Sequence, residues 1–250
     1  MTHIRALCFD LDNTLWDVWP VIRRAEQRMY EFLAERYPRV VALVTLEAMR
    51  EARERVAERF PEMKHDFSFL RKQALRDHAF QCGYDEHLAE EAFNEFIKAR
   101  NEVDLYPDVL PGLERLRQRY RLFTATNGNA DLHRIGLAHF FERTVSARQV
   151  GALKPAPAMF HRAIEGTDLA AEEVAYIGDD PALDIDGARR AGMRAVWVDR
   201  AQVSWPDGLE APSHRVATLL ELVELLASNP TLSSTTPVGT KGRSSSASMT

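Results

Sequence analysis

Cysteine is almost missing from this chain, which has only Cys8 and Cys82 among its 250 residues. Two cysteines so far apart provide neither a disulfide framework nor the spacing of a metal site. Long uninterrupted apolar runs are missing as well, so no segment is expected to span a membrane. The first five residues lead directly into an apolar run, which leaves no room for a signal peptide. These absences predict a reduced, cytoplasmic protein.

An excess of positive charge is also missing. The formal net charge is -5 and the pI is about 5.9, so nucleic acid is not an expected partner. The hydrophobic fraction of 45% is ordinary for a globular protein. The chain is long enough for one substantial core and a small second module. A small phosphate ester remains a suitable ligand, because the local field at a site decides such binding.

Two aspartates follow the first apolar run, which extends from Ile4 to Phe9. At the end of a buried strand, Asp10 and Asp12 would concentrate negative charge that a hard divalent cation, most simply Mg²⁺, would neutralise. One carboxylate could then attack an electrophile while the other transfers a proton. The structural alternative is a turn or a helix N-cap rich in Asp and Asn.

Three later apolar runs also end in polar residues, in this order along the chain: Thr126-Asn127-Gly128 after residues 121–125, Lys154-Pro155 after 151–153, and Gly178-Asp179-Asp180, with Asp184 nearby, after 174–177. Together with Asp10 and Asp12, these segments resemble the haloacid dehalogenase superfamily of phosphohydrolases. The shared pattern is an Asp-x-Asp-x-Thr strand end, a Ser/Thr strand end, a Lys and an acidic strand end. The resemblance covers roughly residues 3 to 227.

Short apolar strands alternate with helical patterns from about residue 106 onward. This alternation predicts an α/β fold with a Rossmann-like parallel sheet and helices on both faces. Ligands bind such sheets beyond the carboxyl ends of the strands, where all four motifs fall. Later strands are expected near Val145 and at 195–198. Helices are expected at residues 113–119, 158–165, 183–191 and 216–227.

The segment from residue 16 to 105 has a different pattern, with helical periodicity and no credible strand. Four helices are expected there, at residues 21–36, 46–60, 67–81 and 86–101. The resemblance implies that this insert is a cap domain over the site, and the alternative is a purely structural appendage. The predicted organisation is a discontinuous core (1–15 and 106–227), a helical cap (16–105) and a disordered Ser/Thr-rich tail (228–250).

The resemblance and the physical reading assign the same roles to the two leading acids. Asp10 is the expected nucleophile, which forms an aspartyl-phosphate, and Asp12 is the expected acid and base. In the family, the backbone carbonyl at the position of Asp12 binds Mg²⁺. The candidate carboxylate ligands are Asp10 with one or both of Asp179 and Asp180. Asp184 is expected to hold metal-bound water or orient the lysine, and the sequence does not choose among these acids.

The phosphate-binding residues are expected at the other two strand ends. Thr126 would donate its hydroxyl to a phosphoryl oxygen, and the backbone amides of Asn127 and Gly128 would add donors. Lys154 would supply a fixed positive charge to the transferring group. Thr14 is expected to fix the first loop rather than to contact substrate.

Substrate selection is expected to depend on the cap. Six of its residues could contact a ligand, although helical packing is the favoured explanation for each of them: Trp16, Trp19, Tyr30, His65, Phe67 and Arg71. A narrower resemblance, in the runs at 12–22, 126–130, 154–160 and 178–180 and in His65-Asp66, points to a bacterial flavin-related branch of the superfamily. That branch dephosphorylates FMN and 5-amino-6-(5-phospho-D-ribitylamino)uracil.

The sequence thus predicts a Mg²⁺-dependent phosphatase, a monomer or small homo-oligomer, that acts on a small phosphate ester. The nearest alternative is a generalist sugar or nucleotide phosphatase. A 2-haloacid dehalogenase would use Asp10 but would require neither Mg²⁺ nor Asp12. A receiver-like phosphorylation switch would retain its phosphate and would not require a long helical insert over the site.

Overall fold

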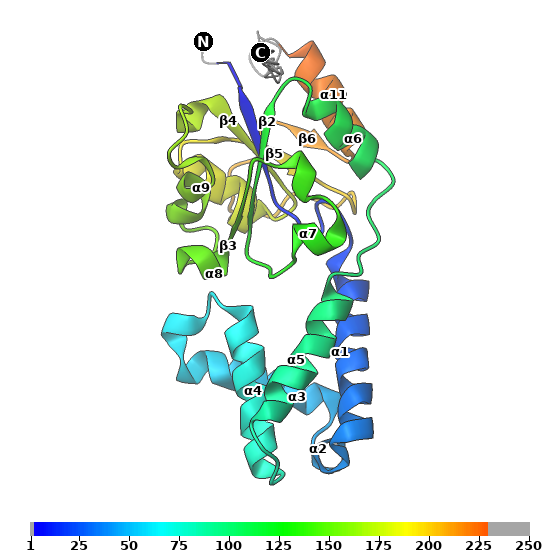
Figure 1. The fold of residues 1–250 in the computed structure, drawn as a ribbon. Coiled ribbons are helices and arrows are strands. Elements are labelled where there is room, and N and C mark those ends of the chain that lie inside the picture. The colour runs from blue at the N-terminus through cyan, green and yellow to red at the C-terminus, as the bar shows by residue number, and fades with distance from the viewer. Residues whose placement is uncertain (1–2, 230–250) are drawn as a thin grey trace, which may run out of the picture.

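The computed structural model describes residues 3–229. Six parallel strands form one sheet in the order β3-β2-β1-β4-β5-β6 (Figure 1). Their bounds are β1 Ala6–Phe9, β2 Arg121–Thr126, β3 Arg143–Ser146, β4 Val174–Gly178, β5 Arg194–Val198 and β6 Arg215–Val216. The helices that accompany the sheet are α6 Val109–Leu116, α7 Leu132–Ile135, α8 Ala147–Val150, α9 Pro157–Ile164, α10 Gly187–Arg190 and α11 Leu219–Ser228.

Strand β1 shows why helices cover both faces of this sheet. Leu7 and Phe9 belong to the core that includes α6 and α11, whereas Ala6 and Cys8 belong to the core that includes α9 and α10. All four side chains are fully buried. Because successive side chains of a strand point to opposite faces, a continuous apolar run needs cover on both. The predicted α/β architecture is therefore confirmed.

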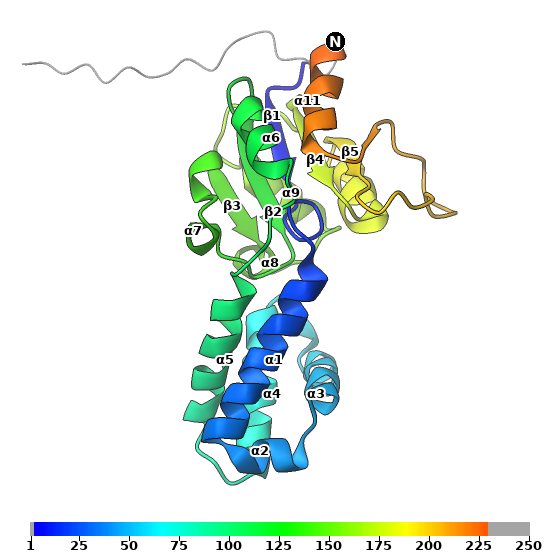
Figure 2. The same ribbon diagram turned by 90° about the vertical axis from the view of Figure 1, so that its right-hand side faces the viewer.

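Five further helices form a bundle at the other end of the molecule (Figures 1 and 2). They are α1 Val18–Arg36, α2 Pro38–Leu43, α3 Leu46–Arg59, α4 Phe67–Gln81 and α5 His87–Arg100. The bundle has its own apolar core, which includes Met29, Leu75 and Phe96. The four helices predicted from periodicity are present. The prediction missed α2, where Pro38 starts a new helix directly after Tyr37.

Two neighbouring segments of the chain join the bundle to the sheet. Trp16 and Leu105 pair as an antiparallel bridge, and the amide of Tyr106 donates to the Leu15 carbonyl at 3.0 Å. Both connections lie beyond the carboxyl end of β1, so the bundle is attached at the edge of the sheet where the sequence motifs end.

Several predicted boundaries differ from the structure. Val216 was expected in a helix, but it pairs with Val198 in the short strand β6, and α11 begins only after the N-cap Thr218. The helix expected at 183–191 is a π-helical turn, Pro181–Asp186, followed by α10. The predicted tail began at Ser228, which is the last residue of α11, while its residues 230–250 lie outside the described part of the chain.

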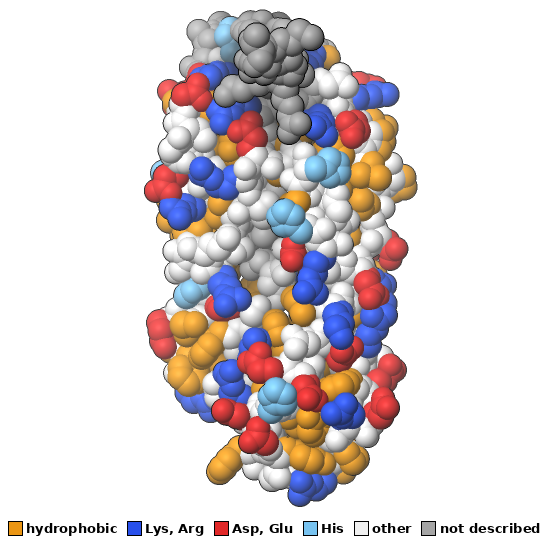
Figure 3. Space-filling view, viewed as in Figure 1, with side chains coloured by type: hydrophobic (Ala, Val, Ile, Leu, Met, Phe, Trp, Pro, Cys, Tyr) orange, Lys and Arg blue, Asp and Glu red, His pale blue; other side chains and the backbone are white. Residues whose placement is uncertain are grey.

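The surface carries charges of both signs. On the face shown in Figure 3, acidic and basic side chains are interspersed over the bundle and over the half that contains the sheet. Among residues 3–229, no helix combines the length and the apolar character needed to cross a membrane. The expected absence of a nucleic-acid partner, the oligomeric state and the compartment remain predictions.

Candidate active site

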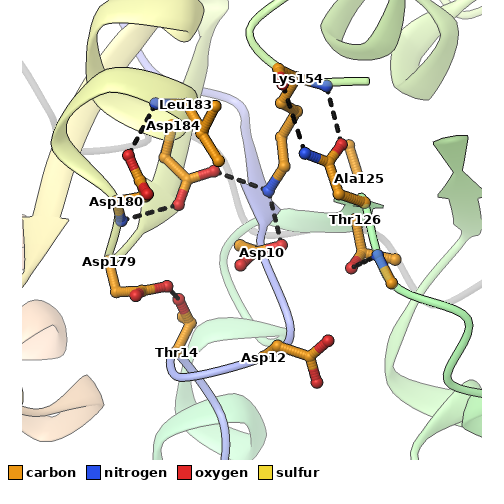
Figure 4. Close-up of polar contacts among 12 residues, drawn as sticks. Asp10, Asp12, Thr14, Ala125, Thr126, Lys154, Asp179, Asp180, Leu183 and Asp184 are labelled. Atoms are coloured by element: carbon orange, nitrogen blue, oxygen red, sulfur yellow. Dashed lines mark hydrogen bonds and ion pairs between the residues drawn. The ribbon is translucent and has the colours of Figure 1, made fainter. Parts of the chain in front are cut away.

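The carboxyl ends of three adjacent strands bring the predicted site residues together (Figure 4). Asp10 directly follows β1, Thr126 is the last residue of β2, and Asp179 directly follows β4. Because β1 lies between β2 and β4, Asp10 occupies the middle of the site. Lys154 enters from the loop after α8.

Lys154 is the electrostatic centre of the site. Its Nζ donates to Asp10 Oδ1 at 2.6 Å, to Asp184 Oδ1 at 2.6 Å and to the Tyr176 hydroxyl at 3.0 Å. Burial alone would lower the pKa of this lysine, but the two carboxylates outweigh burial and raise the pKa above its usual value. The Tyr176 hydroxyl donates to the Ala125 carbonyl at 2.6 Å, which leaves its oxygen free to accept from Lys154. Lys154 is therefore held charged.

Three carboxylates could hold a metal ion. Asp10, Asp179 and Asp184 each offer an oxygen, and these oxygens lie within 4.8 Å of one another. Burial raises the pKa of Asp10 to about 7 and, with the Asp10 charge, the pKa of Asp179 to about 8. A divalent cation would offset this repulsion, and carboxylate oxygens are ligands that Mg²⁺ prefers. The residues present thus fit a hard divalent ion.

Neighbouring groups fix the orientation of two of these acids. The Thr14 hydroxyl donates to Asp179 Oδ1 at 3.2 Å, as expected for a residue that fixes the loop. Asp184 is fully buried, and its Oδ2 accepts from the Asp180 amide at 3.0 Å. A Cβ at position 178 would come within 2.4 Å of Asp184 Oδ2, so the close approach of Asp184 requires the glycine found there, Gly178.

The carboxylate of Asp180 makes different contacts from that of its neighbour Asp179. Its Oδ1 accepts from the backbone amides of Ala182 and Leu183 at 2.9 and 2.8 Å, so its carboxylate caps the π-helical turn. Among the described residues, the structure does not bring this carboxylate into the metal-binding cluster.

Asp12 points away from the carboxylate cluster (Figure 4). Its carboxylate accepts from Trp16 Nε1 at 2.9 Å and from Arg100 Nη2, which lies 2.7 Å from both oxygens. Arg100 is the last residue of α5 and is 1% exposed. No sequence pattern marks this arginine, because a basic residue in the last turn of a helix is ordinary. The two acids of the first motif therefore occupy different electrostatic environments.

The phosphate-binding candidates divide into two kinds. The Thr126 hydroxyl oxygen accepts from the Gly128 amide at 3.0 Å, so its hydrogen remains available for a ligand. The Asn127 side chain accepts from the Lys154 amide at 2.7 Å and donates to the Lys154 carbonyl at 3.3 Å. Asn127 thus fastens the lysine loop to the end of β2, a structural role that sequence reasoning did not assign to it.

A cavity of about 350 Å³ lies over these residues, between the sheet and the bundle. The bundle contributes Val18, Trp19, Ile22, Arg53 and Phe67 to its lining. Of the six residues considered for ligand contact, Trp19 and Phe67 therefore lie at this cavity. The other four lie elsewhere: Trp16 in the core of the sheet domain, Tyr30 and Arg71 within the bundle, and His65 at a neighbouring cavity.

Comparison with known proteins identifies the family. The sequence model of the haloacid dehalogenase-like hydrolases matches residues 4–192. The chain belongs to this family. The match spans the bundle and the strand ends that carry Asp10, Thr126 and Asp179. Together with the phosphatase relatives, it confirms the prediction of an enzyme of the hydrolase and phosphatase type.

Three similar proteins represent two chemistries. The 5-amino-6-(5-phospho-D-ribitylamino)uracil phosphatase YigB of Escherichia coli is 33% identical over 78% of this chain and 84% of its own length. The phosphoserine phosphatase of Thermus thermophilus is 38% identical over 61% of this chain and 64% of its own. A 2-haloacid dehalogenase structure from Pseudomonas syringae has a TM-score of 0.85 and 38% identity, and covers 90% of this chain and 98% of that one.

Proposed function

We propose that this chain is a Mg²⁺-dependent phosphomonoesterase that acts on a small organic phosphate through an aspartyl-phosphate at Asp10. One observation carries the proposal: Lys154 lies 2.6 Å from Asp10 within a carboxylate cluster, while the second acid, Asp12, is held separately. This separation supplies the two roles that phosphoryl transfer to a carboxylate requires, a charged nucleophile and an independent proton donor.

Asp10 and Asp179 are the proposed carboxylate ligands of Mg²⁺. Both oxygens of Asp184 already accept hydrogen bonds, from Lys154 and from the Asp180 amide, so we assign to Asp184 the orientation of Lys154 and of metal-bound water. When bound, Mg²⁺ would reduce the repulsion between a carboxylate and a dianionic phosphoryl group.

The reaction then proceeds in two halves. A carboxylate oxygen of Asp10 forms a bond to phosphorus as the bond to the leaving oxygen breaks, and Asp12 gives that oxygen a proton. In the second half, Asp12 takes a proton from a water molecule, whose oxygen attacks phosphorus and releases Asp10 and inorganic phosphate. Lys154 and the Thr126 hydroxyl stabilise the charge on the transferring group in both halves.

The helical bundle of residues 16–105 is the proposed cap. Its side chains Trp19, Ile22 and Phe67 provide apolar walls for the cavity above Asp10, and Trp19 and Phe67 are 62% and 42% exposed. Exposed aromatic side chains beside a catalytic centre suit a leaving group with a flat ring. In this proposal the cap excludes water and contacts the leaving group, and the core performs the transfer.

The relative YigB supports a ribityl phosphate with a heterocycle as the substrate, in line with the flavin-related resemblance. We propose FMN or 5-amino-6-(5-phospho-D-ribitylamino)uracil, which would place the chain in riboflavin biosynthesis. Equal efficiency on sugar phosphates, nucleotides and these two compounds would leave the phosphatase proposal intact and favour the generalist alternative.

A second candidate function is 2-haloacid dehalogenation, which the Pseudomonas syringae structure favours. In that reaction Asp10 would displace halide from carbon, without a metal ion and without protonation of an alkoxide leaving group. The buried carboxylate cluster and the separately held Asp12 would then have no task. These residues therefore favour phosphoryl transfer.

One experiment separates the two functions. Phosphate release from p-nitrophenyl phosphate and chloride release from 2-chloropropionate are measured with the same protein, first with a chelator and then with added Mg²⁺. We expect phosphate release that requires Mg²⁺ and no chloride release. Chloride release that does not depend on Mg²⁺, without phosphate release, would overturn the proposal.

A further inference from the structure

A cluster of buried charges in the bundle is not used by the proposed mechanism. Glu26 on α1 is 2% exposed and faces three arginines from two other helices. Its carboxylate lies 2.7 Å from Arg50 Nε, 3.2 Å from Arg71 Nη2 and 3.4 Å from Arg53 Nη2. Arg50 also pairs with Glu47 at 2.9 Å. The cluster therefore contains more positive than negative charge.

Arg71 is buried inside this cluster. It is 6% exposed, and its guanidinium lies 3.7 Å from the ring centroid of Phe96. Burial, together with the charge of Arg53, lowers the pKa of Arg71 to about 9 despite the presence of Glu26. Three arginines therefore share the one buried carboxylate of Glu26.

Arg53 is the member of the cluster that reaches the active-site cavity. Its distance to Glu26 is the longest of the three, and its side chain is 32% exposed. A guanidinium that has one long ion pair and is partly exposed retains N–H groups that can donate to a ligand. The same cavity is also lined by Asp10, Thr126 and Lys154, which would hold the phosphoryl group, and by apolar side chains of the bundle.

We propose that Arg53 binds an oxygen acceptor, a carboxylate or a ring carbonyl, at the end of the leaving group remote from phosphorus. This inference rests on the proposed phosphatase function and narrows its substrate class. The substrate is then a phosphate ester whose leaving group has an oxygen acceptor at its far end. The forked guanidinium suits such oxygens because it can donate two parallel hydrogen bonds.

The test compares Arg53→Ala with Arg55→Ala on the same helix. Arg55 has a 62% exposed side chain and pairs only weakly with Glu51, at 3.5 Å, so it controls for the loss of a basic residue from α3. Glu26 keeps its two shorter ion pairs in the Arg53 variant, so the bundle should remain folded. Arg53→Lys, which retains the charge without the fork, gives an intermediate case, and thermal unfolding checks each protein.

The probes are aryl phosphates with a carboxylate, a carboxamide or a methyl group at the far end, each on a phenyl and on a longer biphenyl ring. Each comparison measures two proteins with the same ester, so differences in leaving-group reactivity between esters cancel. For the aryl phosphates with a carboxylate at the far end, we expect Arg53→Ala to lower kcat/KM by about tenfold to a hundredfold, as for loss of a hydrogen bond to a charged group. For the aryl phosphates with a methyl group at the far end, Arg53→Ala should change kcat/KM by less than about threefold. Arg55→Ala should leave kcat/KM unchanged for all of the probes.

Binding of the matching benzylphosphonates, measured by calorimetry, separates this inference from the proposed function. A preference for the carboxylated phosphonate that disappears in Arg53→Ala supports the inference even if no ester is hydrolysed. If Arg53→Ala affects all end groups equally, at both ring lengths and in binding, the inference is overturned and the role of Arg53 is structural. Hydrolysis of the methyl-substituted aryl phosphates by the unmodified protein supports the phosphatase proposal, whether or not the inference about Arg53 holds.

Discussion

The cluster of charges at the sheet (the sheet end) and the cluster inside the bundle (the bundle end) have opposite imbalances of charge. At the sheet, Asp10 and Asp184 pair with the single ammonium of Lys154, and Asp179 adds a third carboxylate to the cluster. In the bundle, three arginines surround the single carboxylate of Glu26. The sheet end could take up a cation, and the bundle end could take up an oxygen acceptor. A Mg²⁺ ion and the far end of a substrate would complete the two ends respectively.

The two ends differ in how the chain fixes them. At the sheet, parallel strands bring Asp10 and Asp179 to one edge, and short hydrogen bonds join Lys154 to Asp10 and Asp184. In the bundle, the packing of α1, α3 and α4 brings Glu26 together with the arginines. Preorganised groups at a rigid edge suit chemistry, whereas side chains on a helical insert can change without altering the catalytic core.

The largest expected effect tests the sheet end. Asp10→Asn removes the proposed nucleophile, and turnover of p-nitrophenyl phosphate should fall by at least about a thousandfold because the covalent route is lost. Asp186→Asn is the matched control, since this acid pairs with Arg190 on the surface of the turn after the site. A steady-state assay measures both variants. Equal activity in the two would remove Asp10 from the mechanism.

The next effect separates the two acids of the first motif. Asp12→Asn should slow phosphate esters with poor leaving groups by about a hundredfold or more, as for loss of general acid catalysis. An activated ester such as p-nitrophenyl phosphate needs less protonation, so its first step should be slowed less. Initial rates on alkyl and nitrophenyl esters provide the measurement. The same loss on both esters would contradict the proposed proton transfer by Asp12.

A third prediction concerns the stability of the bundle end. Glu26→Gln leaves Arg71 buried without its counter-charge, and we expect a loss of about 3–5 kcal/mol in the free energy of unfolding. Glu51→Gln breaks an exposed pair with Arg55, and its effect should stay within about 0.5 kcal/mol. Urea unfolding compares the two variants. A similar small loss in both would show that the cluster is balanced without Glu26.

The smallest expected effect is a dependence of Mg²⁺ binding on pH. The pKa values of Asp10, about 7, and Asp179, about 8, lie above those of an unfolded chain. The metal-free protein is thus stabilised by these groups at low pH and loses that contribution as pH rises through 7 and 8. Mg²⁺ binds the ionised forms, so the Tm increase on adding Mg²⁺ should be larger at pH 8.5 than at pH 6.

Mass action sets the size of this effect. At free Mg²⁺ of 100 times the Kd, the gain is about 2.7 kcal/mol, which is roughly 5–10 °C in Tm for a chain of this length. Asp179→Asn should weaken both the gain and its dependence on pH. A Tm increase that is the same at both pH values would contradict binding of Mg²⁺ at these acids.

Most active-site residues at the sheet could be predicted from the sequence, because an apolar strand that ends in polar residues is visible as a local pattern. Asp10, Thr126 and Asp179 stand at the ends of apolar strands, and parallel pairing places such ends at one edge. Lys154 was also expected at a strand end, but it lies in the loop after α8. The bundle end could not be predicted in this way. Arg53 is one of several arginines in a helix, and its place at the cavity depends on how α3 packs against α1 and α4.

The features that were missed from the sequence have a common physical cause, because each depends on contacts that form only in the folded chain. Tyr176 lies inside an apolar strand, so its hydrogen bond to Lys154 could not be distinguished from ordinary core packing. Arg100 reaches Asp12 across 88 positions of sequence. Strand β6 has only two residues, too few to show a pattern, and its pairing with β5 depends on the completed sheet.

The most direct test of the account is the identification of the phosphorylated residue. The Asp12→Asn protein is mixed with Mg²⁺ and an activated phosphate ester, quenched in acid within milliseconds and digested, and its peptides are analysed by mass spectrometry. Attack by Asp10 without efficient hydrolysis predicts a phosphorylated peptide with the modification on Asp10, absent from Asp10→Asn. Phosphate release without any phosphorylated peptide, or phosphorylation at another residue, would contradict the proposed mechanism.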